Sequence, residues 1–400
     1  MKNIYLIVWC CLMAFSVAAC TNAQFDQVIE SVEQVTGLTN DDDTAAPAIE
    51  SGPAELPYVV ETELSEVSID EVETFYAYQA VSEEVRTVYK EVLDTILGHK
   101  SEIRLSVYDA SILEQAFEAV TADHGELFWI DGYSYTEYTF SGKVTGIEFM
   151  PTYTMTESAR SQYQSQIDQK NNEILAGLPA DASEYDKVKY VFRYLIEHVD
   201  YVEGSENNQN ILSVYMNGET VCQGYADAAQ YLLKLLGIQS AIVTGTANSG
   251  AHAWNLIYID GEPYYFDATW GNSRYQDTDQ TIAKYVNYAY MAFTTEEMER
   301  THWVGNDFEV PVCTAINNSY FVKEGLYFSE YAEEEIGQEI QNAWNNNEDR
   351  IAVKFATEED MDMASTTFID EFKISDYCLG LETVYYLSDR DMNVLMIQFR

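Results

Sequence analysis

The dipeptide Asp260-Gly261 lies between two short β-rich segments and constrains the fold of this chain more than any other local feature. Asp-Gly favours the two-residue turn of a β-hairpin, in which both central residues have positive φ angles. With these residues in the turn, Asp267 faces Trp254, and His252 lies two residues further along on the same face. A shift of one residue would separate the two side chains. The hairpin therefore predicts a histidine that a carboxylate can orient.

The hairpin strands are predicted over residues 252–259 and 263–269, after a β-rich run at 241–244. A helix precedes them, beginning at Cys222 and ending before Gly237. Its apolar residues recur at intervals of three and four: Ala226, Ala229, Leu233 and Leu236. Unpaired N–H groups and the positive end of the dipole at a helix start favour a thiolate over a thiol. Because the thiolate is the nucleophilic form, this position suits nucleophilic chemistry.

Each of the three polar residues also has an ordinary structural interpretation. A buried cysteine often serves as a small apolar core residue, a single histidine is often a hydrogen-bonded structural residue, and Asp267 could cap a turn. However, the order of the three residues, the helix start and the hairpin register are independent requirements of one Cys-His-Asp mechanism. Their coincidence favours an enzyme.

The segment 181–272 resembles the transglutaminase-like superfamily, and most closely its bacterial secreted and lipoprotein branch. Three sequence blocks carry the resemblance: V-C-Q-G-Y-A from Val221, H-A-W-N from His252 and D-A-T-W from Asp267. The resemblance covers about a quarter of the chain. It implies an α+β, papain-like core, in which the helix with the cysteine packs on an antiparallel sheet carrying the histidine and the aspartate.

The resemblance also implies a role for each residue of the triad. Cys222 would be the nucleophile, His252 the general base and acid, and Asp267 the orienting carboxylate. The superfamily contains crosslinkers, proteases, amidases and inactive members, so the resemblance leaves both substrate and reaction direction open.

Five segments are expected along the chain. They are a lipoprotein signal peptide at 1–20, an acidic tether at 21–80, an N-terminal α+β domain at 81–155, the transglutaminase-like catalytic domain at 156–305 and a C-terminal α+β domain at 306–400. Both flanking domains read as helix, strand, helix and two strands. They therefore resemble copies of one small unit, and chance similarity of layer architecture is the alternative.

The N-terminus has the pattern of a lipoprotein leader. An apolar stretch ends in Val17-Ala18-Ala19-Cys20, where small residues precede a cysteine that would be diacylated after cleavage. The alternative is an uncleaved membrane anchor. Both interpretations export the rest of the chain, so we expect it at the cell surface, held at the outer face of the bacterial cytoplasmic membrane through Cys20.

Acidic residues dominate the charge of the chain, which has a formal net charge of −46. This charge argues against nucleic acid or an anionic membrane surface as a partner. A protein or peptide substrate, including cell-wall peptide, remains compatible with it. The segment from Thr21 to Glu84 contains no Lys or Arg, and its repelling charges predict an extended tether. The sequence leaves the oligomeric state open.

The remaining cysteines and histidines stand apart from the triad. Cys313 and Cys378 could form a disulfide in an exported protein, although their spacing alone cannot establish one. The histidines and cysteines lack zinc-site spacing, and no cofactor is expected. His198 is expected to be structural, and three other histidines are left outside the site because they have no cysteine and carboxylate context: His99, His124 and His302.

Aromatic residues beside the triad blocks are candidates for a substrate cleft, since tyrosine and tryptophan combine an apolar body with a polar tip. Core packing is the alternative for each of them. The cleft candidates are Tyr215, Gln223, Tyr225, Trp254 and Trp270. For the oxyanion we expect one donor in the backbone N–H of Cys222 and a second in the side chain of Gln209 or Tyr215.

Two classes of function follow from these features. The first is a lipid-anchored cysteine acyltransferase or hydrolase, in which Cys222 attacks a carboxamide or peptide carbonyl and forms a thioester. A lysine amine or water would then resolve the thioester, giving protein crosslinking, deamidation or proteolysis. The alternative is a catalytically idle module with the same scaffold that serves in adhesion or cell-wall binding.

Overall fold

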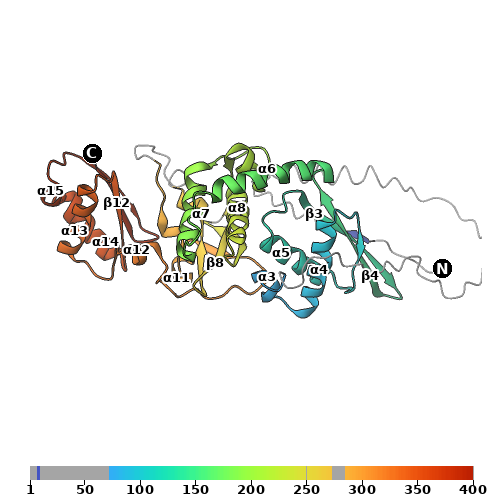
Figure 1. Ribbon diagram of the computed structural model, residues 1–400. Helices are drawn as coiled ribbons and strands as arrows, with labels where there is room; N and C mark the ends of the chain where they lie inside the picture. Colours follow the sequence, from blue (N-terminus) through green and yellow to red (C-terminus); the bar gives the residue numbers. More distant parts are fainter. Residues whose placement is uncertain (1–6, 10–71, 249, 273–283, 400) are drawn as a thin grey trace, which may run out of the picture.

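The computed structural model describes residues 7–9, 72–248, 250–272 and 284–399 (Figure 1). Its helices and strands fall into three groups along the chain, and each group contains a four-stranded sheet. In Figure 1 the central group, in yellow and green, lies between the N-terminal group in blue and teal and the C-terminal group in orange and red. The chain is thus mixed helix and sheet, and the predicted α+β class is confirmed.

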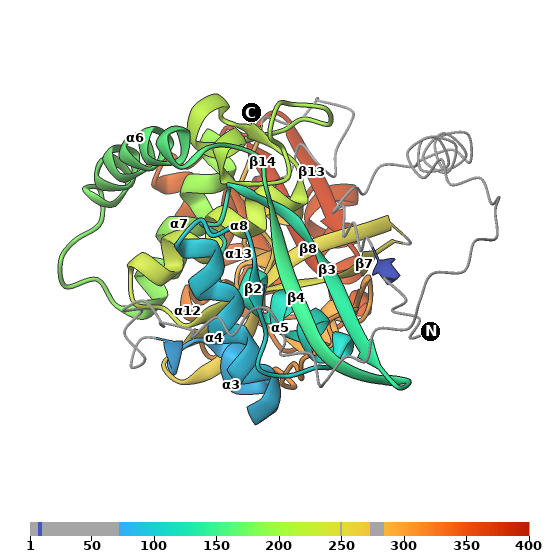
Figure 2. The same ribbon diagram turned by 90° about the vertical axis from the view of Figure 1, so that its right-hand side faces the viewer.

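The N-terminal group packs two helices beside a long antiparallel hairpin (Figure 2). Its sheet has the order β1-β3-β4-β2. The apolar residues expected at helical spacing, such as Val85, Val92 and Ile96, are buried. Its elements are β1 (Ile7–Trp9), α3 (Tyr76–Ala80), α4 (Glu83–Leu97), β2 (Ile103–Arg104), α5 (Ala110–Asp123), β3 (Ile130–Phe140) and β4 (Lys143–Tyr153).

The central group holds the predicted catalytic core, and its sheet has the order β10-β7-β8-β9. A capping box formed by Ser183 and Asp186 begins α7. The elements of this group are α6 (Glu157–Leu175), α7 (Glu184–His198), β5 (Asp200–Tyr201), the π-helix η1 (Ser213–Asn217), β6 (Glu219–Thr220), α8 (Cys222–Leu235), β7 (Ser240–Ala247), β8 (Gly250–Ile259), β9 (Glu262–Phe266), α9 (Ala268–Gly271), the 3-10 helix η2 (Tyr288–Tyr290), α11 (Thr295–Met298) and β10 (His302–Val304).

The C-terminal group has its own core and a sheet of order β11-β12-β14-β13. Its second long helix, α14, continues directly into a π-helix. The elements are α12 (Tyr320–Lys323), β11 (Tyr327–Phe328), α13 (Glu333–Asn345), β12 (Arg350–Phe355), α14 (Glu358–Ser365), the π-helix η3 (Thr366–Asp370), α15 (Ile374–Tyr377), β13 (Val384–Asp389) and β14 (Val394–Phe399).

The two flanking groups share a strand topology. In each four-stranded sheet the last strand lies between the two strands that precede it in the chain and pairs antiparallel with both: β4 between β2 and β3, and β14 between β12 and β13. The helix-strand-helix-strand-strand order expected from the sequence is therefore present in both flanks. Descent of the two flanks from one duplicated unit stays a prediction.

The predicted hairpin forms with the expected register. Asp260 and Gly261 have φ angles of 55° and 81°, as a two-residue turn requires. Asn255 pairs with Phe266, which sets the next residue, Asp267, opposite Trp254. The predicted strand 263–269 is too long, however, because β9 ends at Phe266. Asp267 leaves the strand because its carboxylate accepts a hydrogen bond from the Trp270 backbone N–H and begins α9.

The expected tether at 21–80 lies mostly outside the described residues, but the folded chain begins earlier than predicted. Ala77 and Tyr78 in α3 are buried, and both backbone N–H groups donate to the Asp123 carboxylate at 2.9 Å. The predicted signal peptide also lies largely outside the description. Among the helices that are described, none is long and apolar enough to cross a bilayer.

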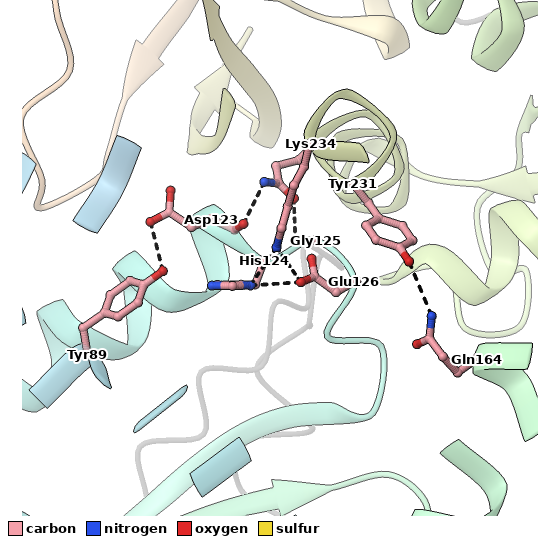
Figure 3. A network of polar contacts seen from close by, with 9 residues as sticks. Tyr89, Asp123, His124, Gly125, Glu126, Gln164, Tyr231 and Lys234 are labelled. Carbon is pink, nitrogen blue, oxygen red and sulfur yellow. Dashed lines mark hydrogen bonds and ion pairs between the residues drawn. The ribbon is translucent and has the colours of Figure 1, made fainter. Parts of the chain in front are cut away.

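A buried polar network joins the N-terminal group to α8 (Figure 3). Gln230 of α8 accepts a hydrogen bond from the Gly125 backbone N–H at 2.9 Å and donates to the Asp123 carbonyl at 2.7 Å. Lys234, one turn further along, pairs with Glu126 at 2.6 Å. Because buried polar groups are costly unless paired, this network fixes how the loop after α5 sits on the helix that carries Cys222.

Gly125 is required at this junction. A Cβ atom there would lie 2.3 Å from the Asp227 backbone oxygen in α8, far inside van der Waals contact. We expect Gly125→Ala to destabilise the protein by about 1–3 kcal/mol, as overpacking of a core does, measured by urea unfolding. Gly250→Ala is the matched control, since its Cβ would meet only the Ala247 carbonyl, at 3.6 Å. Equal unfolding midpoints for the two variants would contradict this account of the junction.

Candidate active site

Cys222 is the first residue of α8, and the helix start around it is closely packed. The preceding N-cap residue is Val221, whose apolar side chain offers no acceptor to the first-turn N–H groups. Gly224 lets the preceding segment approach, because a Cβ there would lie 2.0 Å from Thr220 Oγ1. Thr220 is itself held by hydrogen bonds to the Asn208 carbonyl and from Ser213. The sulfur therefore lies at a rigid, electropositive helix end.

The structure brings the three predicted triad residues together. His252 of β8 has its Nε2 atom 2.7 Å from Asp267 Oδ2, and both side chains are buried. The Cys222 side chain lies close enough to the same imidazole to help raise its pKa. Cys222 is 8% exposed as a whole residue and is therefore buried. The histidine thus lies between the cysteine and the carboxylate, the order that the predicted triad requires.

The electrostatics of the pair favour a charged histidine. Burial opposes protonation of His252, but the Asp267 carboxylate, helped by Cys222, outweighs burial and raises the pKa of His252 to about 10. Burial likewise opposes ionisation of Asp267, but the two histidines beside it hold its pKa well below the usual range. At neutral pH the site therefore places an imidazolium beside the Cys222 side chain.

A second histidine contacts the same carboxylate, which corrects our exclusion of His302 from the site. His302 Nε2 lies 3.2 Å from Asp267 Oδ2, and the side chain is fully buried. The expectation failed because His302 comes from β10, which reaches the site by pairing with β7. No local motif in the sequence predicts that long-range pairing. The one available signal was that His302 begins a short strand. His99 and His124, also excluded, contact other groups.

Two of the cleft candidates enclose the histidines. Trp254 stacks on His252 with ring centroids 5.8 Å apart, and Trp270 lies 4.7 Å from the His302 ring. Both tryptophans are at least 95% buried. They therefore form the apolar wall that excludes water from the pair, instead of lining an open cleft. Of the two roles considered from the sequence, core packing is therefore correct for both tryptophans and a cleft role is not. Side chains alternate along β8, so Trp254 lies on the same face as His252.

The two tyrosine candidates lie in the interior as well. The Tyr215 hydroxyl donates to Asn171 Oδ1 at 2.6 Å, and the Tyr225 hydroxyl donates to the Val199 carbonyl at 2.7 Å. Both rings are buried. The expectation that they line a cleft is therefore corrected, because each hydroxyl satisfies a buried partner. Tyr215 is also a poor second oxyanion donor for the same reason.

Gln223 is the cleft candidate that lines a cavity. A cavity of about 220 Å³ lies between α8, β7 and the N-terminal group, and residues lining it include Gln209, Asn210, Gln223, Asp227, Thr121 and Gly125. Gln223 immediately follows Cys222 and donates to Asp227 at 2.8 Å. Gln209, the other candidate for the second oxyanion donor, also faces this cavity. None of the three triad residues lines this cavity, so Gln223, the sequence neighbour of Cys222, connects it to the start of α8.

The two remaining cysteines are not joined. Within the described ranges Cys222, Cys313 and Cys378 are all free and buried. Cys313 packs in the main hydrophobic cluster, and Cys378 in the separate cluster of the C-terminal group. Burial raises the pKa of Cys313 to about 12 and that of Cys378 to about 11. Both therefore stay thiols at neutral pH.

The central part of the chain matches one known protein family. Residues 169–268 match the family model described as "Transglutaminase-like superfamily". This segment, which contains Cys222, His252 and Asp267, matches a transglutaminase-like domain, and the predicted superfamily is confirmed. The secreted and lipoprotein branch stays a prediction.

Two curated relatives each match a part of this protein. Kyphoscoliosis peptidase from Mus musculus is 26% identical over 132 residues, and its counterpart from Homo sapiens is 26% identical over 130 residues. In both cases the match covers 28% of this chain and 20% of the relative. The chain thus spans about a fifth of the length of these relatives.

Two solved structures are similar in part. One, described as the crystal structure of a TGase, is 18% identical, with a TM-score of 0.27, and the match covers 39% of this chain and 48% of that one. The other, described as a putative cysteine protease from Cytophaga hutchinsonii, is 19% identical, with a TM-score of 0.23. That match covers 35% of this chain and 58% of the other.

Proposed function

We propose that this chain is a cysteine acyltransferase or hydrolase that acts on a carboxamide or peptide bond through a thioester on Cys222. One observation carries the proposal: His252 contacts both Cys222 and Asp267 at the start of α8. A buried carboxylate that orients a histidine beside a helix-start cysteine is the arrangement that activates a thiol for attack on a carbonyl.

The proposed reaction has two steps. The Cys222 thiolate attacks the carbonyl carbon, a C–S bond forms, and the oxygen gains negative charge beside the first-turn N–H groups of α8. The C–N bond then breaks, and the His252 imidazolium gives its proton to the leaving ammonia or amine. In the second step His252 takes a proton from water or a lysine amine, which attacks the thioester and releases Cys222. Water gives hydrolysis, and an amine gives a crosslink.

The cavity beside Gln223 is the proposed site for the substrate group next to the scissile bond. Gln209, Gln223 and Asp227 offer it both donors and acceptors of hydrogen bonds, which suits a peptide or a carboxamide. A protein or a cell-wall peptide is the proposed class of partner. The acidity of the chain supports this class over a nucleic acid.

A library of glutamine-containing peptides and cell-wall peptide fragments tests the proposed activity. With the intact protein we expect a covalent adduct on Cys222 by mass spectrometry, and no adduct with Cys222→Ala. Release of ammonia with incorporation of an added amine identifies crosslinking, release without incorporation identifies deamidation, and cleaved peptide identifies proteolysis. A library that yields no adduct and no product would favour the idle adhesion module instead.

The proposed location rests on the leader sequence alone. Val17-Ala18-Ala19-Cys20 supports cleavage before Cys20 and diacylation of its thiol. Because two acyl chains give stable anchoring whereas one holds only marginally, we expect the expressed protein in the membrane fraction and Cys20→Ala largely released from it. Cys11→Ala, in the apolar leader, is the matched control and should stay bound. Equal membrane binding of Cys20→Ala would identify the leader as an uncleaved anchor.

A further inference from the structure

His302 contributes the third hydrogen bond to the Asp267 side chain. Its Nε2 atom lies 3.2 Å from Asp267 Oδ2, and its Nδ1 atom lies 2.7 Å from Thr301 Oγ1. The side chain is fully buried, so its polar atoms cannot be hydrated and depend on these protein partners. We propose that His302 is a positioning residue, a second imidazole donor that fixes Asp267 toward His252. This inference rests on the proposed function and deepens it.

The contact with Asp267 requires a proton on Nε2 of His302. An ionised carboxylate only accepts hydrogen bonds, so the Nε2 atom facing Asp267 must be the donor. The Thr301 hydroxyl, which can donate or accept, lies 2.7 Å from the Nδ1 atom. Both ring nitrogens therefore have a buried hydrogen-bond partner, and these two contacts hold the ring with its Nε2–H toward Asp267.

These contacts hold both oxygens of the carboxylate. Oδ2 accepts from His252 at 2.7 Å and from His302 at 3.2 Å, and Oδ1 accepts from the Trp270 backbone N–H at 2.9 Å. A carboxylate with donors on both oxygens cannot rotate without breaking a buried hydrogen bond. The orientation of Asp267, and through it that of the His252 ring, is therefore set partly by β10.

A shared metal ion is the other arrangement that these residues suggest, since their ligand atoms all lie within 4.8 Å of one another. The shortest separation argues for a hydrogen bond. Two ligands at about 2.0–2.1 Å from a tetrahedral zinc ion lie about 3.3 Å apart, whereas His252 Nε2 and Asp267 Oδ2 are 2.7 Å apart. That distance is ordinary for a charge-assisted hydrogen bond.

Two substitutions at position 302 separate positioning from packing. His302→Leu fills the space without a donor, whereas His302→Gln keeps an N–H near the place of Nε2. His198→Gln is the matched control, because His198 is an exposed residue whose ring contacts the Tyr194 carbonyl. The first readout is the low-field NMR signal of the His252 proton bonded to Asp267. The second is the rate of Cys222 alkylation by iodoacetamide across the pH range.

We expect His302→Leu to weaken or broaden the His252 signal and to slow alkylation about tenfold or more, as removal of a hydrogen bond to a charged group does. His302→Gln should recover most of both, and His198→Gln should match the unmodified protein. An unchanged His252 signal in His302→Leu would overturn the inference, as would equal losses in the Leu and Gln variants or stoichiometric zinc by elemental analysis. If the signal responds while Cys222 is unreactive in the unmodified protein, the proposed function fails and the positioning role stands.

Discussion

Replacing Cys222 by alanine is expected to abolish product formation entirely, because no other group in the site can form the thioester. His252→Ala should have nearly the same effect, since the remaining thiol would have no adjacent base. Cys222→Ala should fold normally, because it removes a single sulfur atom. His252→Ala removes a buried ring that bonds Asp267 and stacks on Trp254, so its folding is checked by urea unfolding. The measurement is the rate of product release on whichever peptide the library identifies.

Cys313→Ala is the control for this prediction. Cys313 is more deeply buried than Cys222, burial raises its pKa to about 12, and its thiol faces the Pro311 carbonyl. Loss of a buried sulfur alone should therefore leave turnover unchanged. If Cys313→Ala lost as much activity as Cys222→Ala, the effect would come from the core and not from the nucleophile.

Asp267→Asn is expected to give the second largest loss, about 10⁴-fold in turnover, by analogy with the carboxylate-to-amide change in serine triads. The amide carries no charge, so the pKa of His252 should fall toward its ordinary value, and the imidazolium would no longer persist at neutral pH. The amide would also place either an oxygen or an NH₂ group against two histidines that both donate to Oδ2.

The pH dependence of Cys222 alkylation provides a second test of the role of Asp267. In the unmodified protein His252 stays protonated well above neutral pH, so activation of Cys222 should persist as the pH falls through 7. In Asp267→Asn the histidine deprotonates at lower pH, and alkylation of Cys222 should depend on pH within the neutral range. A pH profile identical to that of the unmodified protein would contradict the role given to Asp267.

Local sequence signals predicted the geometry of the pair well. The Asp260-Gly261 turn fixes the register, and because side chains alternate on a strand, the register places His252 and Asp267 on one face. The helix start at Cys222 is a similarly local property. These features need only a few neighbouring residues, so one sequence was enough to predict them.

Long-range contacts were beyond the same reasoning. His302 meets Asp267 because β10 pairs with β7, and Gln223 borders a cavity whose other wall belongs to the N-terminal group. The sequence also could not separate buried aromatic residues from exposed ones. Tyr225 and Trp254 are residue types that often line clefts, and only the packed structure reveals that each side chain is buried.

The most direct test of the account is competitive alkylation of the intact protein with limiting iodoacetamide at about pH 6–7, followed by peptide mass spectrometry. Cys222 should be modified far faster than Cys313 and Cys378, whose raised pKa values keep them as thiols. That advantage should largely disappear in His252→Ala. If Cys222 reacts no faster than the other two cysteines, or equally fast without His252, the site does not activate a nucleophile and the proposed chemistry is wrong.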